Sequence, residues 1–164
     1  MTQPDDATSA TEPDWAREAP ARPWDPSRRL IRAIRRHPTA GRFGRRWWVM
    51  QHRFWSVVTG ADIPLGLSVG GGLRIPHPTG IVIHPDAVIG PNCTLMQGIT
   101  IGTDRTGVVP RIGGHVDIGA GARILGGVTI GDHAQIGANA VVLRDVPAGM
   151  VAVGVPATIR APRA

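Results

Sequence analysis

One histidine and one aspartate in this chain have the residue types and the spacing that proton transfer requires. The imidazole of His77 titrates near neutral pH and can take a proton from a hydroxyl group. Asp62 stands 15 residues earlier, and a carboxylate near the imidazole can hold its tautomer and stabilise its charged form. The alternative is that His77 fills a corner of the fold and bonds a backbone carbonyl. The choice depends on the elements that position the two residues.

A six-residue repeat runs through most of the chain after residue 60. The first phase of the repeat occupies Leu65, Gly71, His77, Ile83, Ile89, Leu95 and Ile101, and the second occupies Ile112, Ile118, Ile124, Ile130, Ile136 and Val142. A small or aliphatic residue follows most of these positions by four places. An α-helix repeats its apolar stripe every 3.6 residues, so the period excludes one long helix. It predicts short strands joined by tight corners, with glycines relieving the corners.

The chain before this repeat has a different character. Residues 1–26 are rich in Pro, Ala, Asp and Glu without a hydrophobic period, which predicts a disordered tail. Residues 28–37 place three aliphatic side chains on one side of a short helix that Pro38 ends. Residues 45–58 predict a second helix, whose Arg and Trp residues favour docking onto the neighbouring domain over a membrane interface.

Aromatic residues mark the boundary between the two regions. All five Trp and both Phe precede residue 56. We therefore expect a tail over residues 1–26, a short helical segment over 27–59 and a repeat domain over 60–160.

The net charge of +6 is unevenly distributed along the chain. It comprises −4 over residues 1–25, +9 over residues 26–60 and +1 over residues 61–164. The basic middle could meet nucleic acid or an acidic membrane surface. Because the main body is nearly neutral, we favour a solvated helix face that also complements a charged ligand. We expect no nucleic-acid partner and no stable membrane insertion.

Composition and cysteine content exclude several classes of protein. With 42% hydrophobic and 18% charged residues, the chain is not wholly disordered. No apolar run approaches 18 residues, and the first residues lack the apolar region of a secretory signal. A single cysteine, Cys93, excludes an internal disulfide, and we expect a cytoplasmic protein. Cys93 stands at an inward small-residue position, which favours a core residue over a nucleophile.

The repeat resembles that of the hexapeptide-repeat acyltransferases, and residues 60–160 look like the serine O-acetyltransferases and their relatives from exopolysaccharide clusters. The matching stretches are GADIP (60–64), IPHPTGIVIHPDAVIG (75–90), CTLMQGITIGT (93–103), DIGAGARILGGVTIG (117–131), IGANAVVLRDVP (136–147) and GVPATI (154–159). The resemblance implies an all-β main domain, a left-handed parallel β-helix of about five coils, preceded by a short α-helical segment.

The resemblance also implies an activity and the residues that perform it. The expected reaction is transfer of an acetyl group from acetyl-CoA to a small hydroxyl compound, L-serine or similar. His77 would be the general base and Asp62 its orienting carboxylate. Acetyl-CoA would lie along the coils between subunits. Its pantetheine would meet backbone groups near Gly102, Thr103, Ala120 and Ala138, although each could also be an ordinary repeat residue.

The departures from the family pattern concern the acceptor. Pro76 stands where serine acetyltransferases have an Asp, and Val108 and Val109 stand where they have an Arg-His pair before a Pro. Arg105 or Arg111 could replace that pair, and the alternative for Arg105 is a solvated loop residue. Loss of charged partners predicts a high KM for L-serine.

A metal site is a weaker interpretation. His115 and His133 are 18 residues apart, which is one coil, so their side chains should stack on one outward face. The γ-class carbonic anhydrases build a three-histidine site on this fold. His84 lies in the other phase of the repeat and no third ligand is evident, so we expect no metal.

Three alternatives to a serine-type acetyltransferase stay open at this point. One is an O-acetyltransferase that acts on a sugar or exopolysaccharide precursor, one is a γ-carbonic-anhydrase-like metalloprotein, and one is a silent β-helix that binds a partner. Because active sites of the family lie between subunits, we expect a homotrimer. The helical segment is too short for the long domain that joins two trimers in typical relatives.

Overall fold

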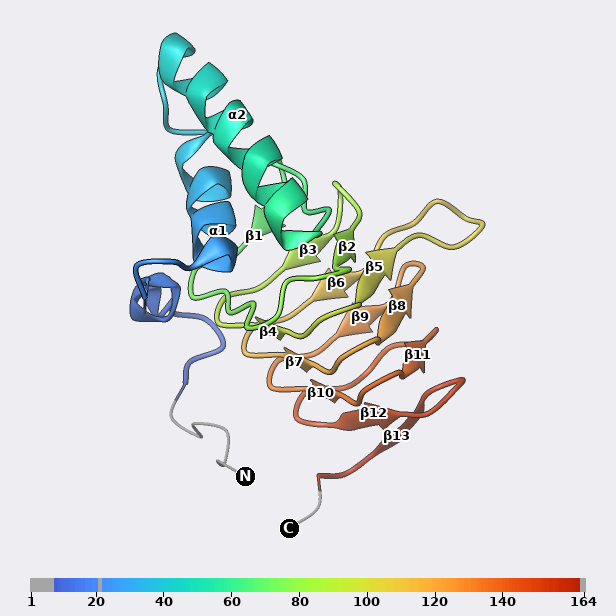
Figure 1. Cartoon of the computed structure of the whole chain (residues 1–164). Helices are drawn as coiled ribbons and strands as arrows, with labels where there is room; N and C mark the ends of the chain where they lie inside the picture. Colours follow the sequence, from blue (N-terminus) through green and yellow to red (C-terminus); the bar gives the residue numbers. More distant parts are fainter. Residues whose placement is uncertain (1–7, 21, 163–164) are drawn as a thin grey trace.

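Three β-sheets form the main body, and successive coils of the chain add strands to each of them (Figure 1). The structure is a computed structural model and describes residues 8–20 and 22–162. Sheet 1 contains β1 (Ser68–Val69), β3 (Val88–Ile89), β6 (Arg111–Ile112) and β9 (Thr129–Ile130). Sheet 2 contains β4 (Thr94–Leu95), β7 (Asp117–Ile118), β10 (Gln135–Ile136), β12 (Val151–Val153) and β13 (Thr158–Arg160). Sheet 3 contains β2 (Val82–Ile83), β5 (Thr100–Gly102), β8 (Arg123–Leu125) and β11 (Val141–Val142).

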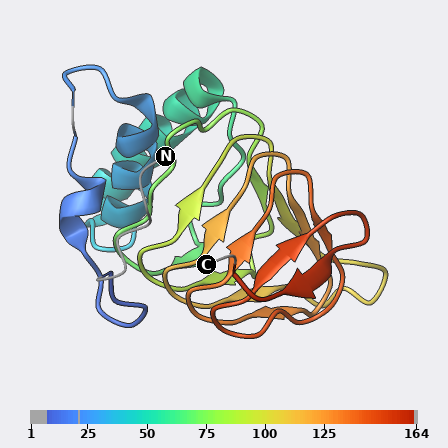
Figure 2. The same cartoon turned by 90° about the horizontal axis from the view of Figure 1, so that it is seen from below.

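Neighbouring strands are parallel, except that β13 pairs antiparallel with β12 and closes the C-terminal end. Figure 2 shows the coils stacked behind one another along one axis. The body is a parallel β-helix of short strands, as the repeat predicted, and it is left-handed, as the resemblance implied.

The repeat positions build the core in the way the period predicted. The aliphatic slots that lie on strands are buried, namely Ile83, Ile89, Leu95, Ile101, Ile112, Ile118, Ile124, Ile130, Ile136 and Val142. Parallel register stacks Ile83 on Ile101 and Ile101 on Ile124. Each coil therefore removes apolar surface from water against its neighbours, which is the main stabilising effect in such a stack. His77 is the exception, because its side chain is exposed.

The corners between strands use the left-handed backbone region. Asn92, His115 and His133 have φ values of 61°, 52° and 59°, and Asn139 has a φ of 55°. Asparagine and histidine tolerate this region better than most non-glycine residues. The two histidines that suggested a metal site are thus corner residues of successive coils.

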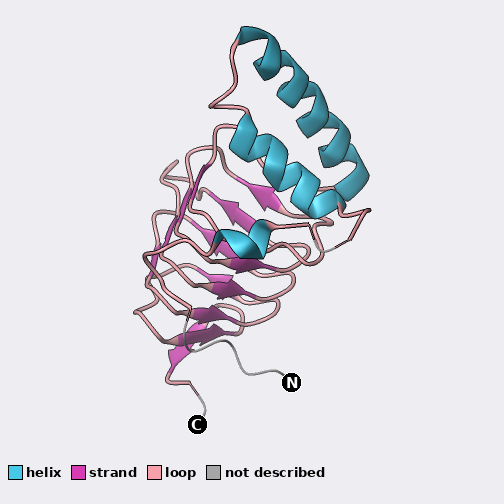
Figure 3. Cartoon of the chain, turned by 90° about the vertical axis from the view of Figure 1, so that its left-hand side faces the viewer, coloured by secondary structure: helices cyan, strands magenta, loops and turns pink. Residues whose placement is uncertain are grey.

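Two helices lie together at the N-terminal end of the coils (Figure 3). Helix α1 (Pro26–Arg36) begins after Asp25, whose carboxylate accepts a hydrogen bond from the Arg28 N–H at 3.2 Å, and has Pro at its first position. Its buried face includes Leu30, Ile31 and Ile34, as the sequence predicted.

Helix α2 (Arg42–Thr59) is longer than predicted and buries only Trp55 and Thr59. It ends at Gly60, whose φ of 65° suits a left-handed cap. The His52 Nε2 atom lies 2.7 Å from the Ile63 carbonyl oxygen, which ties the helix to the first coil. Among the described residues, no helix has the length and apolar character needed to cross a membrane.

The segment before α1 corrects the prediction of a disordered tail. Residues 8–20, here called the N-terminal segment, run along the coils and include a short 3₁₀ helix, η1 (Trp15–Glu18). The Asn92 side chain accepts from the Asp14 N–H at 2.8 Å and donates to the carbonyls of Ser9 and Glu12 at 2.7 and 2.8 Å. Composition predicted disorder because it does not show that the coils offer a buried polar side chain to this backbone. The rest of the predicted tail, residues 1–7 and 21, lies outside the described residues.

Glycines explain how the N-terminal segment approaches so closely. A Cβ atom on Gly71 would lie 2.6 Å from the ring of Trp15. The glycine in that repeat slot therefore provides space for an aromatic ring from 56 residues earlier in the chain.

Candidate active site

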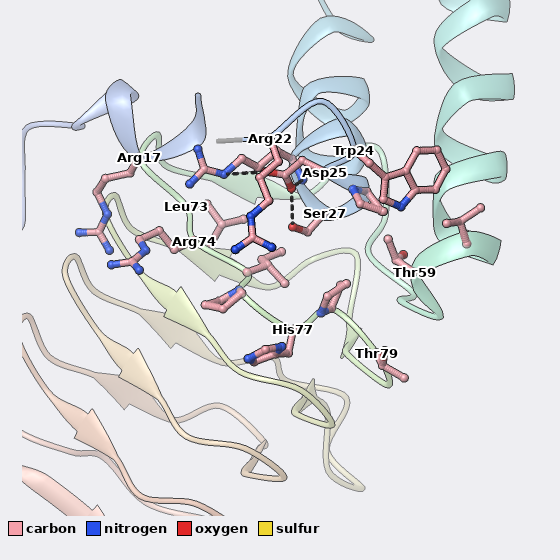
Figure 4. Close-up of a pocket in the computed structure, with 16 residues that line it drawn as sticks. Arg17, Arg22, Trp24, Asp25, Ser27, Thr59, Leu73, Arg74, His77 and Thr79 are labelled. Atoms are coloured by element: carbon pink, nitrogen blue, oxygen red, sulfur yellow. Dashed lines mark hydrogen bonds and ion pairs between the residues drawn. The ribbon is translucent and has the colours of Figure 1, made fainter. Parts of the chain in front are cut away.

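His77 lies at a corner where the chain passes from sheet 2 to sheet 3, just before β2. Its side chain is exposed and lines a cavity of about 450 Å³, here called the corner pocket. The pocket is bounded by residues 73–79 of the first coil, by the chain leading into α1 and by the end of α2. Figure 4 shows His77 on the coil side of this pocket, across from the chain that leads into α1.

Asp62 lies beside the strand that follows the His77 corner. Its backbone forms a parallel bridge with Val82, and its carbonyl accepts a hydrogen bond from the Ile83 N–H at 3.0 Å. The two side chains are both exposed, and no hydrogen bond or ion pair joins them among the described residues. The structure therefore places Asp62 beside Val82, after the His77 corner, without an observed contact to the imidazole.

Two of the four predicted pantetheine positions lie, like His77, at a corner between sheet 2 and sheet 3. The Asn139 N–H donates to the Ala120 carbonyl at 2.8 Å, so Ala120 and Ala138 lie at equivalent corners of successive coils between sheets 2 and 3. Gly102 ends β5 and Thr103 follows it, at the other edge of sheet 3. The structure thus separates the four positions into two pairs.

A second cavity, of about 660 Å³, runs along sheet 2 and is here called the sheet-2 groove. It shares Arg74 and Pro76 with the corner pocket and extends past Gly119 and Gly137, the residues immediately before Ala120 and Ala138. An extended molecule in this groove would have one end close to His77. The glycines there also have a structural role, because a Cβ on Gly119 would lie 2.6 Å from the Ala138 backbone nitrogen.

Arg105 lies away from His77 within one chain. It is exposed in the loop between β5 and β6, which projects from the edge of sheet 3 opposite the His77 corner (Figure 1). In this loop the Asp104 carboxylate accepts hydrogen bonds from the Thr106 backbone and hydroxyl, which lower the pKa of the carboxyl group. Val108 in the same loop is exposed as well.

The remaining candidate residues fall outside the pocket. The Nδ1 atoms of His115 and His133 lie 2.9 Å apart on one face, as their 18-residue spacing predicted. Within the described part of the chain, no group of three or more His, Cys, Asp or Glu side chains could hold a metal ion. Cys93 is fully buried, and burial raises the pKa of its thiol to about 12. A thiol in that environment is a core residue.

Sequence reasoning missed the arginines of the corner pocket. Arg17 and Arg22 fall in the region that composition assigned to a tail, and Arg74 occupies an ordinary outward position of the repeat. The one available signal was the surplus of arginine close to the helical segment.

Comparison with known proteins gives a consistent result for the coils. Residues 110–144 match the family described as bacterial transferase hexapeptide (six repeats). The chain is 51% identical over 104 residues to serine acetyltransferase 1, chloroplastic, of Arabidopsis thaliana, across 60% of this chain and 32% of that protein.

Two solved structures agree with this similarity. A serine acetyltransferase in complex with CoA matches with a TM-score of 0.73 and 34% identity, over 84% of this chain and 58% of that one. The serine acetyltransferase of Neisseria gonorrhoeae in complex with serine matches with a TM-score of 0.71 and 38% identity, over 82% of this chain and 57% of that one. The chain therefore spans less than two thirds of each of these proteins.

Proposed function

We propose that this chain, whose coils carry the bacterial transferase hexapeptide repeat and are similar to serine acetyltransferases, is an acetyl-CoA-dependent O-acetyltransferase. The acceptor is a small hydroxyl compound, L-serine or a similar one. The observation that supports this most is an exposed histidine in the corner pocket, next to Pro76, which that pocket shares with the sheet-2 groove. One cavity would hold the acceptor and the other the pantetheine arm of acetyl-CoA.

His77 acts as the general base in this proposal. Its imidazole takes the proton of the acceptor hydroxyl while the oxygen attacks the carbonyl carbon of the thioester. Backbone N–H groups stabilise the negative charge that develops on the carbonyl oxygen. The C–S bond then breaks, and the imidazolium returns its proton to the departing CoA thiolate. Atoms and charges balance without an acyl-cysteine, in agreement with the burial of Cys93.

Asp62 has the role of positioning residue. Its carboxylate would hold the His77 tautomer and stabilise the imidazolium. The proposal draws support from its place beside Val82, on the strand that the His77 corner leads into. Pantetheine contacts are proposed for Ala120 and Ala138, which border the sheet-2 groove, and for Gly102 and Thr103 across sheet 3.

Substitution of His77 tests the proposed chemistry directly. His77→Ala should lower kcat by about 10²–10⁴ with little change in CoA affinity, because only the proton transfer is lost. Asp62→Asn should cost less. The assay measures free thiol released from acetyl-CoA, and His84→Ala is the matched control because His84 lies outside both cavities. Undiminished turnover by His77→Ala would refute the assignment.

The acceptor site departs from the family pattern at Pro76, Val108 and Val109. A site that lacks charged partners for a free amino acid binds it weakly. We therefore propose that L-serine is used with a high KM. A KM in the low micromolar range would show that other residues, Arg105 of a neighbouring subunit among them, provide the missing contacts.

The proposed assembly is a homotrimer in the cytoplasm. Within one chain the Arg105 loop and the His77 corner lie at opposite edges of sheet 3, so a closed ring of three copies offers a way to bring them together. Light scattering should give a mass of about three times 17.4 kDa. A hexamer would contradict this and would point to α2, whose exposed apolar residues are the surface left to join two trimers. The single buried cysteine supports the compartment.

A further inference from the structure

The corner pocket carries a surplus of positive charge that acetyl transfer by itself does not require. Four of its lining residues are arginines, Arg17, Arg22, Arg28 and Arg74. Among the described lining residues, Asp25 is the only acidic one. Its carboxylate already accepts hydrogen bonds from the Arg28 N–H and the Ser27 hydroxyl, both at 3.2 Å, and pairs with Arg28 Nε at 3.4 Å. Asp25 therefore does not neutralise the positive charges of Arg17, Arg22 and Arg74.

Among the described residues, these three guanidinium groups form no ion pair, although Asp117 and Asp14 lie near enough to Arg17 to act on its charge. In the described part of the chain, no ion pair or hydrogen bond joins a carboxylate to the side chain of Arg17, Arg22 or Arg74. One Arg17 nitrogen donates to the Thr94 hydroxyl at 3.1 Å, while its buried Nε has no partner there. The side chains of Arg22 and Arg74 are therefore free to turn toward a ligand.

The pKa of Arg17 shows that placing these positive charges close together is unfavourable. Burial lowers the pKa of Arg17, and the positive charge of Arg74 lowers it further. The carboxylates of Asp117 and Asp14 act in the opposite direction with smaller effect. An anion bound between Arg17 and Arg74 would relieve the repulsion between them.

The backbone that carries Arg74 and Arg17 is held in place before any ligand binds. The Arg74 N–H donates to the Cys93 carbonyl at 2.9 Å, and the Arg74 carbonyl accepts from the Leu95 N–H at 2.9 Å. The Glu18 carboxylate, next to Arg17, accepts from the Leu73 N–H at 3.0 Å. The backbone at Arg74 and beside Arg17 therefore needs no rearrangement when a ligand binds, which favours affinity.

We propose that the corner pocket binds an anionic group of the acetyl acceptor, a carboxylate or a phosphate, through Arg74 and Arg22, with Arg17 beside Arg74 (Figure 4). This inference rests on the proposed function, because it places the acceptor hydroxyl at His77. Guanidinium groups bind carboxylate and phosphate through paired hydrogen bonds. A volume of about 450 Å³ suits a small molecule and excludes a polymer from all but its rim.

The same pocket is poorly suited to a positive group. An ammonium on the acceptor would have to compete with Arg28 for Asp25, and Pro76 offers it no carboxylate. The acceptor class is therefore an anionic hydroxyl compound in preference to a neutral or a zwitterionic one.

Three compounds of the same carbon skeleton test this preference. Glycerol, D-glycerate and sn-glycerol 3-phosphate differ in whether they carry no anion, a carboxylate or a phosphate. With thiol release from acetyl-CoA as the assay, at least one of the two anions should have a kcat/KM about 10- to 100-fold above that of glycerol. Which of the two is better identifies the anion. Equal values for all three would overturn the proposal.

Substitution of the arginines shows whether they cause the preference. Arg74→Gln and Arg22→Gln should each move the ratio of the better anion to glycerol toward one. Arg53→Gln, an exposed arginine of α2 outside every described cavity, should leave the ratio unchanged. Arg22 lies outside any helix or strand, so its substitution keeps the test valid even if Arg74→Gln fails to fold. An unchanged ratio in both variants would contradict the proposal.

Calorimetry separates this inference from the proposed function. The three compounds are titrated into the protein in the presence of CoA. Binding of sn-glycerol 3-phosphate or D-glycerate that Arg74→Gln weakens, without acetylation of any compound, would leave the anion site standing and refute the acetyltransferase. Acetylation of glycerol with no tighter binding of either anion would support the acetyltransferase and refute the anion site.

Discussion

The coils and the region before them are stabilised in different ways. In the coils the inward positions are buried in every strand of the repeat, from Ile83 to Val142. Helix α2, of 18 residues, buries two. Its large apolar residues Phe43, Trp47, Met50, Phe54 and Val57 are at least 52% exposed. The N-terminal segment has no such core and is held by individual polar contacts such as those of Asn92.

The coils therefore stabilise the fold, whereas the region before them shapes the pocket. The coils bury a stack of aliphatic side chains that any coil of the same repeat could provide. The region before them contributes little to that stack, yet it supplies Arg17 and Arg22 to the corner pocket. The part of the molecule with the weaker core thus contains the residues that distinguish its pocket.

Truncation of one core residue should show the largest effect on stability. Ile101 is fully buried between Ile83 and Ile124, so Ile101→Ala should lower the free energy of unfolding by about 2–5 kcal/mol through lost burial and a cavity. Val57→Ala on the exposed face of α2 should change it by about 0.5 kcal/mol or less. Urea unfolding followed by circular dichroism measures both. Equal losses would show that α2 is covered in the assembled protein.

Removal of the Asn92 side chain should detach the N-terminal segment. Asn92→Ala loses three hydrogen bonds to that segment, a cost of about 2–4 kcal/mol beyond the backbone strain. Asn139→Ala is the matched control, because its φ of 55° is close to the 61° of Asn92 and its side chain is exposed. Urea unfolding gives the difference, and limited proteolysis shows whether residues 8–20 are cleaved faster. Similar losses in the two variants would mean that the segment adds no stability.

A smaller effect is expected from the ion pair that joins the N-terminal segment to α1. The Glu18 carboxylate accepts from Arg35 at 2.8 and 3.2 Å and from the Leu73 N–H at 3.0 Å, while Arg35 also donates to the carbonyls of Val69 and Gly70. Glu18→Gln should cost about 1–2 kcal/mol because charge-assisted hydrogen bonds are lost. Hydrogen exchange should rise in α1 and at Leu73. Glu12→Gln, at an exposed residue, is the control, and an equal response of both variants would contradict the assignment.

The smallest expected effect on stability comes from the exclusion of water around the buried Cys93 thiol. Burial raises the pKa of the Cys93 thiol from 9.0 to about 12, so the folded chain keeps the proton while the unfolded chain releases it above pH 9. Stability should be unaffected below pH 9 and fall as the pH rises, by about 1.4 kcal/mol at pH 10. Cys93→Ala should lack this component in urea unfolding at pH 8 and pH 10. Rapid reaction of the native thiol with Ellman's reagent at pH 8 would show that the site is open to solvent.

The sequence by itself determined the coils and the identity of the candidate base. A period of six with aliphatic slots has one economical solution, short strands that stack their inward residues, and these slots are buried as predicted. The change in aromatic content also located the end of the helical region, since α2 ends at Thr59. These features are local or periodic, so they can be read from neighbouring residues.

Only the tertiary structure decided where the N-terminal segment lies and what charge surrounds His77. The contact between Asn92 and Ser9 joins residues 83 positions apart, and no period connects them. Arg17 reaches the corner pocket because Asn92, Glu18 and the space above Gly71 fix the segment on the coils. A composition that predicts disorder counts the apolar residues within a segment, whereas this segment is ordered by polar groups that another part of the chain provides.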